Sequence, residues 1–193
     1  MIELTDDAFY ETLKKYDRCC IDYCLMKDDQ PYQEETSHRK AVLFAMEKIS
    51  ALSPSDSLEI HISRAEAVRI DSRKLFAFPD RPWKHNVNGT VLYDNVYEDG
   101  KIPYWYAFLE PPHATGPIMQ DGKIIRNHYA KEDFDIVNRT LFPMGTDHLV
   151  IYSWTTDWSD YFDDGHEWWG AACWSIYDPQ MERYAVILVS ATD

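Results

Sequence analysis

The hydrophobic positions near the start of the chain repeat at helical spacing. One apolar stripe is formed by Phe9, Leu13, Tyr16, Cys20 and Cys24, with Thr5 placed to cap its start. This spacing predicts a helix from residue 5 to about residue 26, with Cys20 and Cys24 as small core residues. After a polar loop with Pro31, a second helix is predicted over 38–52 and ends at Ser53-Pro54-Ser55. Its inward positions are Val42, Ala45, Met46, Ile49 and Leu52.

The period changes to two after residue 57. Apolar and polar residues alternate over 58–63, which predicts a half-buried strand. Asn88-Gly89 lies between extended segments and predicts a tight hairpin. Asp99-Gly100 predicts another turn, leading into a strand over 104–109 that is apolar on both faces. A long loop over 111–130, rich in Pro, Gly and His, follows.

The last third of the chain predicts a helix, a strand and a closing hairpin. Phe134, Val137 and Leu141 share one side of a short helix over 132–141, and residues 149–154 form a strand. Residues 169–177 and 183–190 then pair around Asp178-Pro179. The order of elements predicts an α+β fold, a single domain over 1–193. The N-terminal helices should pack together on one face of a mainly antiparallel sheet that ends in a C-terminal hairpin.

The charge balance narrows the classes of partner. The net charge is −14, and residues 94–193 contribute −11 of it, with 17 acidic against 6 basic residues. A field of this sign repels nucleic acids and anionic membrane surfaces, and favours a basic protein, a cation or a neutral ligand. Solubility alone is the simpler explanation of the same charge.

The sequence also indicates a compartment. The N-terminus lacks the basic and apolar regions of a secretory signal, and the longest apolar runs are too short to span a bilayer. Four cysteines, three of them at 19, 20 and 24, do not resemble a disulfide framework. We therefore expect a cytoplasmic protein without a membrane anchor.

Residues 157–174, DWSDYFDDGHEWWGAACW, combine five carboxylates with six large aromatic residues and contain no Lys or Arg. An EF-hand with its glycine at Gly165 would need oxygen ligands where Phe162 and Ala171 stand. The H-E-x-x-H zinc helix would need a second histidine where Gly170 stands. We therefore expect no metal and no cofactor, with a different calcium site on Asp160, Asp163 and Asp164 as an open alternative.

Nucleophilic catalysis has little support in the sequence. Cys173 with His166 as its base would be a candidate pair. However, Cys173 lies in a predicted half-buried strand, and burial raises the pKa of a thiol and keeps it protonated and unreactive. The serine hydrolase elbow, the P-loop and the dinucleotide fingerprint are absent. Paired carboxylates beside Trp158, Trp168 and Trp169 leave open a glycosidase-like hydrolase or a sugar-binding module.

A binding protein with a basic protein partner accounts best for these features. Aromatic anchors and a ring of charge are what protein interfaces use. The chain is similar in general character to small cytoplasmic bacterial immunity proteins, which mask basic toxin domains with acidic surfaces; this similarity rests on no shared motif. The expected site lies on an exposed loop over 157–167, with a second part in the loop after residue 109. Its residues are Trp158, Asp160, Tyr161, Asp163, Asp164 and Glu167, together with Glu110 and His113.

Overall fold

The fold was obtained as a computed structural model of the 193-residue chain. The structure describes residues 1–16, 20–52, 57–78, 84–87, 90–93, 102–109, 118–120, 123–125, 129–167 and 170–191.

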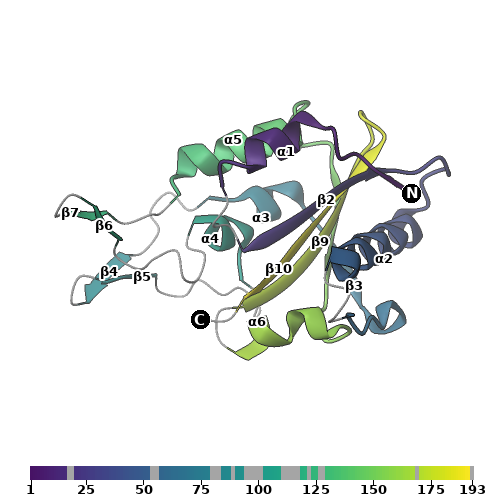
Figure 1. The fold of residues 1–193 in the computed structure, drawn as a ribbon. Helices are drawn as coiled ribbons and strands as arrows, with labels where there is room; N and C mark the ends of the chain where they lie inside the picture. Colours follow the sequence, from purple (N-terminus) through teal and green to yellow (C-terminus); the bar gives the residue numbers. More distant parts are fainter. Residues whose placement is uncertain are drawn as a thin grey trace.

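A six-stranded antiparallel sheet forms the centre of the molecule (Figure 1). Its strands lie in the order β1, β2, β10, β9, β8, β3, which confirms the α+β fold class and the antiparallel sheet. Two further hairpins, β4–β5 and β6–β7, pair separately from this sheet. The strands are β1 (Ile2–Glu3), β2 (Ile21–Lys27), β3 (Ala67–Ile70), β4 (Lys84–Val87), β5 (Thr90–Tyr93), β6 (Ile118–Gln120), β7 (Lys123–Ile125), β8 (Val150–Trp154), β9 (Gly170–Asp178) and β10 (Arg183–Ala191).

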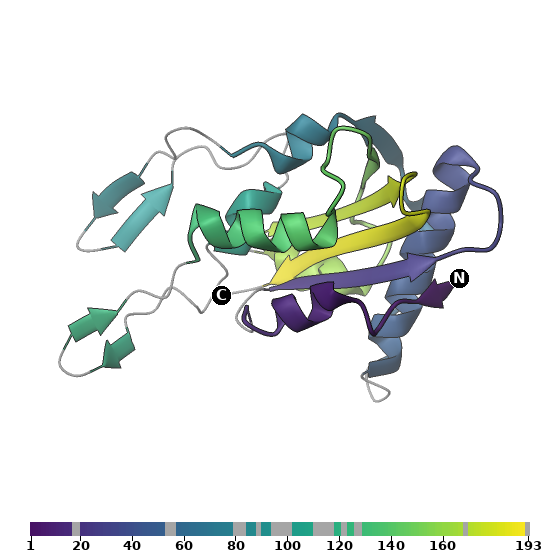
Figure 2. The same cartoon turned by 90° about the horizontal axis from the view of Figure 1, so that it is seen from above.

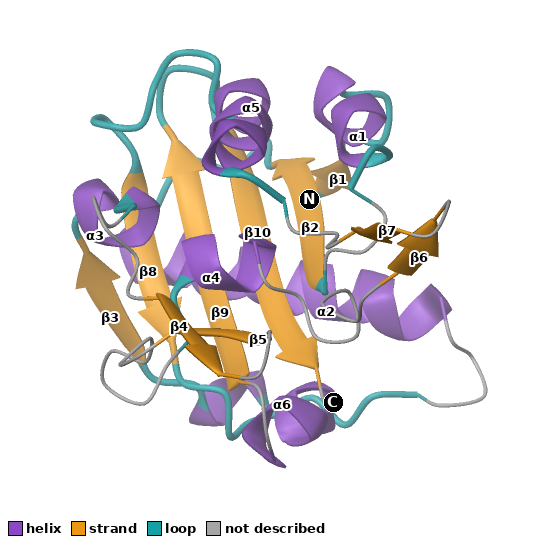
Figure 3. Cartoon of the chain, turned by 90° about the vertical axis from the view of Figure 1, so that its left-hand side faces the viewer, coloured by secondary structure: helices purple, strands orange, loops and turns teal. Residues whose placement is uncertain are grey.

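Helices cover both faces of the sheet, so the main body has three layers (Figure 3). One face carries α1, α3, α4 and α5, while α2 lies on the other, a separation that Figure 2 also shows from above. The helices are α1 (Ala8–Leu13), α2 (Glu34–Leu52), α3 (Ser72–Phe76), α4 (Tyr104–Leu109), α5 (Lys131–Leu141) and α6 (Asp163–Glu167), with two short 3-10 helices, η1 (Ile62–Arg64) and η2 (Asp160–Phe162).

The sheet separates two hydrophobic cores because successive side chains of a strand point to opposite faces. In β9, Ala172 and Trp174 belong to the core under α1, α4 and α5, whereas Ala171 and Cys173 belong to the core under α2. Both faces of this strand are buried over 171–174. Strands buried on both faces carry nearly continuous apolar runs.

The C-terminal hairpin forms as predicted. Asp178 ends β9, and its Oδ1 atom accepts hydrogen bonds from the backbone N–H groups of Gln180 and Met181 at 2.9 and 3.1 Å. Such a side-chain-to-backbone turn, with Pro179 inside it, reverses the chain into β10. Helices α2 and α5, strand β8 and the β4–β5 pairing on either side of Asn88-Gly89 also confirm their predictions.

The N-terminal prediction was wrong in two respects. The helix expected over 5–26 is the short helix α1, capped by Asp7 rather than Thr5, followed by strand β2. Cys24 thus lies on a strand, although it is buried as expected. In addition, α1 and α2 pack on opposite faces of the sheet, and Leu52 is 82% exposed rather than inward.

Two predicted strands are also replaced. The segment over 104–109 is helix α4, because Tyr104, Ala107 and Phe108 bury one helical side against α5. Around residue 60 the backbone makes only an isolated bridge, from Ile60 to Ser159, before η1 begins. Within the predicted loop over 111–130, β6 and β7 pair with each other. The predicted turns at 53–55 and at Asp99-Gly100 lie outside the described residues.

Candidate functional site

The segment 157–167 is held to the protein by two buried aromatic side chains. Trp158 is 1% exposed and Phe162 is fully buried, and their rings meet edge to face with centroids 5.2 Å apart. The indole N–H of Trp158 donates to the backbone oxygen of Thr155. The exposed position predicted for Trp158 was therefore wrong, because its ring fills the core under α2.

The carboxylates of this segment point outward. Asp157, Asp160, Asp163, Asp164 and Glu167 are all exposed, on η2, on α6 and on the turn before them. Asp160 also holds the segment in place, since its Oδ1 atom accepts a hydrogen bond from the Glu59 backbone N–H at 3.0 Å. No Lys or Arg of the described part of the chain forms an ion pair with any of the five.

A sixth carboxylate joins this surface from another element. The hydroxyl of Tyr161 donates to Asp22 on β2 at 2.7 Å, across 139 residues of sequence. Burial, together with the negative charge of Asp22, raises the pKa of Tyr161 well above its usual value, so this phenol stays protonated and donates. Tyr161 is therefore half-buried and bound to the protein's own carboxylate, not a free anchor.

We define the acidic face as Asp22, Asp157, Asp160, Asp163, Asp164 and Glu167. The sequence identified four of its members as site residues and placed Asp157 in the same exposed segment. It missed Asp22 because residues 5–26 were interpreted as one helix. The alternation of Asp22 with Ile21 and Tyr23, had it been taken as a strand pattern, would have been the available signal.

The other predicted site residues cannot be joined to this face. Glu110 and His113 lie outside the described residues, as do Trp168 and Trp169, on which the sugar-binding alternative depended. In the part of the chain that is described, no group of three or more His, Cys, Asp or Glu residues could hold a metal ion. The alternative calcium site on Asp160, Asp163 and Asp164 is therefore not assembled.

The described cysteines are not activated for nucleophilic attack. Cys173 is 1% exposed in the middle of β9, and burial raises the pKa of Cys24 to about 12. Burial also raises the pKa of Cys20. His166, the base considered for Cys173, lies within 2.8 Å of the Thr156 hydroxyl on the surface.

One serine and histidine pair does lie at hydrogen-bonding distance. His38 Nδ1 and Ser175 Oγ are 2.8 Å apart, but both residues are fully buried in the core between α2 and the sheet. Because no substrate can reach a fully buried hydroxyl, this pair is structural. No helix among the described residues is long and apolar enough to cross a membrane.

Comparison with known proteins finds a distant sequence similarity. No protein family matches the chain, and no solved structure matches it. A similar sequence is Ufm1-specific protease 2 of Rattus norvegicus, with 28% identity over 136 residues. The matched region covers 69% of this chain, and this chain spans only 28% of the length of the rat protein.

Proposed function

We propose that this chain is a binding protein whose acidic face engages a basic protein partner. The observation that carries the proposal is the set of six exposed carboxylates gathered from β2, η2 and α6, without an ion pair to any described Lys or Arg. Concentrated charge of one sign speeds the encounter with a partner of opposite charge and selects against partners of the same charge.

The way in which the acidic segment is held supports this proposal. Trp158 and Phe162 fix it to the core, while Tyr161 and Asp160 tie it to β2 and to Glu59. A surface that is already ordered loses little conformational freedom when a partner binds. The partner contacts would then be made by the carboxylates themselves and by the half-buried ring of Tyr161, with Trp158 acting only as a support.

Proteolysis, the activity in the name of the rat protein, is not our proposal for this chain. Cys24 and Cys173 are buried, and the described serine and histidine pair is closed to solvent. The hydrolase alternative also lacks a specific observation, because Asp163 and Asp164 are neighbours on one exposed helical turn rather than carboxylates facing each other across a cleft.

A paired-variant binding experiment tests the proposal. Basic proteins from the source cell are passed over the immobilised chain, and the association rate of each captured protein is measured from low to physiological salt. We expect the rate to fall steeply with salt. Asp163→Asn with Asp164→Asn should slow association by about tenfold at low salt.

The matched control removes the same two charges elsewhere. Asp6→Asn with Glu132→Gln changes exposed residues at α1 and α5, on the opposite face of the sheet. This control should change the rate by less than about twofold. Equal effects of the two pairs, or capture that is insensitive to salt, would show that the charge serves solubility.

A further inference from the structure

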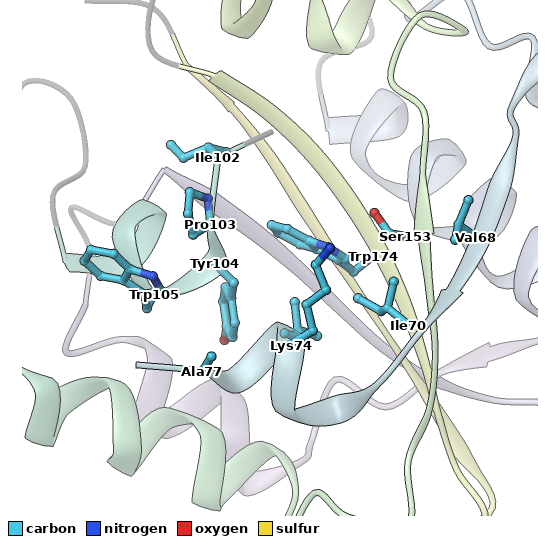
Figure 4. Close-up of a pocket in the computed structure, with 11 residues that line it drawn as sticks. Val68, Ile70, Lys74, Ala77, Ile102, Pro103, Tyr104, Trp105, Ser153 and Trp174 are labelled. Atoms are coloured by element: carbon cyan, nitrogen blue, oxygen red, sulfur yellow. The ribbon is translucent and has the colours of Figure 1, made fainter. Parts of the chain in front are cut away.

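A pocket of about 300 Å³ lies on the opposite face of the sheet from α2 and η2 (Figure 4). It is enclosed by β3, by α3 and by the start of α4, and its floor is formed by β8 and β9. The side chains that line it are mainly apolar, among them Val68, Ile102, Tyr104, Trp105 and Trp174, and its polar exceptions are Ser153 and Lys74.

Strand register builds the floor of the pocket. Val68 pairs with Ser153 across β3 and β8, and Ser153 pairs with Trp174 across β8 and β9, so the three residues form one row on one face. Ser153 and Trp174 are buried, whereas Val68 at the rim is 63% exposed. The pocket therefore has a deep aromatic end and an open end at the edge of the sheet.

The wall opposite β3 is fixed by packing and hydrogen bonds. The Tyr104 hydroxyl donates to Asn138 Oδ1 at 3.1 Å and lies 2.9 Å from the Tyr23 hydroxyl. Ile102 packs against Gly170, where an added Cβ atom would lie 2.9 Å from Cβ of Ile102. This wall of the pocket is thus held in place by contacts within the protein itself.

Positive charge lies at the mouth of this pocket, in contrast to the net charge of −14. Lys74 is exposed on α3, and its side chain extends toward the Trp174 ring in Figure 4. Lys74 also takes part in an interaction within the chain, and its ammonium group places a positive charge at this side of the pocket. Arg73, the next cation on α3, is exposed and does not line the pocket.

We propose that this pocket binds a compact aromatic carboxylate, with its ring beside Trp174 and its carboxylate near Lys74. The volume stands at the lower end of the range for ligand sites, which suits one or two fused rings. Trp174, Trp105 and Tyr104 offer aromatic surfaces for edge or offset contacts with such a ring. An ammonium group at the rim favours an anionic ligand over its neutral analogue.

Two probes of the same shape test this proposal. Naphthoate and naphthamide differ in charge but not in outline, and each is titrated into the protein while the indole N–H signals are followed by NMR. We expect saturable shifts at Trp174 and Trp105 with naphthoate and weaker binding of naphthamide. Trp158 lies in the other core, so its signal should stay in place.

Three variants separate the pocket from the charge. Ala77→Trp at the exposed rim should block both probes without disturbing the fold. Lys74→Gln should weaken the binding of naphthoate by about threefold to fivefold and change the affinity for naphthamide by less than about twofold. Arg73→Gln, the control, should change the affinity for either probe by less than about twofold. The proposal is overturned by any of three results: no saturable shift, binding that survives Ala77→Trp, or equal loss of naphthoate in the Lys74 and Arg73 variants.

Discussion

The His38 imidazole lies 2.8 Å from the Ser175 hydroxyl, at the centre of a buried hydrogen-bond chain between α2 and the sheet. The indole N–H of Trp154 donates to Ser175 Oγ at 2.8 Å, so the Ser175 hydroxyl hydrogen is available to His38 Nδ1. His38 Nε2 then carries the proton and donates to the Tyr32 hydroxyl at 3.2 Å. With Ser175 as the donor to Nδ1, the His38 imidazole is neutral.

The first prediction concerns acid stability. Burial lowers the pKa of His38 to about 3, whereas the unfolded chain binds this proton near its ordinary value of about 6.5. The neutral imidazole therefore contributes fully above about pH 6.5, and its contribution is lost as the pH falls from there toward 3. Between these values, the free energy of unfolding should fall by up to about 1.4 kcal/mol per pH unit from this group.

Urea unfolding of the wild type and of His38→Gln, from pH 7.5 down to pH 4, isolates the contribution of His38 to the pH dependence of stability. The two proteins have the same carboxylates, so the effects of carboxylate protonation cancel in the comparison. The difference in free energy of unfolding between the two should shrink as the pH falls. His61→Gln, which removes an exposed histidine, is the matched control. A constant difference for His38→Gln would contradict the prediction.

The second prediction concerns a buried ion pair between the two ends of the chain. Arg183 is buried at the start of β10; one guanidinium nitrogen donates to Asp7 Oδ2 at 2.8 Å and the other to the backbone oxygen of Leu141. Asp7 also caps α1 by accepting from the Phe9 N–H at 2.9 Å. Asp7→Asn keeps a capping side chain but leaves a buried cation without its anion.

We expect Asp7→Asn to lower the free energy of unfolding by about 2–4 kcal/mol, since uncompensated buried charge is costly and Asp7 is only partly buried. Thr5→Ala, at the cap position that the sequence pattern had indicated, should cost less than about 0.5 kcal/mol. Chemical denaturation of the two variants compares them directly. A similar cost at both positions would mean that the ion pair contributes little.

The sequence predicted the elements whose pattern had a single interpretation. The amphipathic helices α2 and α5 and the turn at Asp178-Pro179 are examples. Residues 9–26 were misread because β2 is covered on both faces. Cys24, Leu25 and Met26 are consecutive buried residues, and apolar residues there also satisfied a spacing of four. Periodicity cannot distinguish a strand buried on both faces from a helix.

The site was predicted only in part, because residue type determines the exposure of some of its side chains and not of others. The carboxylates at 157–167 are exposed because isolated carboxylates are too costly to bury, which is a property of the residue type. Whether an aromatic ring faces a partner or the core is not a property of its type, and Trp158 proved to be core. The pocket beside Trp174 depends on register across three strands, which local sequence does not encode.

The third prediction follows from the position of Trp158. Trp158→Ala removes a ring that is 1% exposed and packed on Phe162, so it should cost about 3–5 kcal/mol of folding free energy. For a domain of this size the melting temperature should fall on the order of ten degrees. Tyr161→Phe, which removes only the hydroxyl bound to Asp22, should cost about 1 kcal/mol. A melting temperature of Trp158→Ala equal to that of the wild type would indicate that this ring is exposed and not part of the core.

The last prediction concerns Gly165, the glycine at which α6 packs closely against strand β9. Gly165 is buried, and a Cβ atom at this position would lie 2.4 Å from the backbone oxygen of Gly170 and 3.0 Å from the Cβ atom of Ala171. Because the first contact is with backbone, it cannot be relieved by rotating a side chain. Gly165→Ala must therefore push α6 away from the start of β9, against the hydrogen bond from the Gly165 N–H to Ser190 Oγ.

We expect Gly165→Ala to cost about 1–3 kcal/mol, although alanine favours helix formation more than glycine does. Glu167→Ala, an exposed change on the same short helix, should stay within about 0.5 kcal/mol of the wild type and serves as the control. Denaturation midpoints give the stability, and hydrogen exchange at residues 163–167 shows whether the loss is local. If Gly165→Ala stabilises the protein and slows this exchange, helix propensity outweighs the close approach, and α6 does not lie against β9 as tightly as the distances indicate.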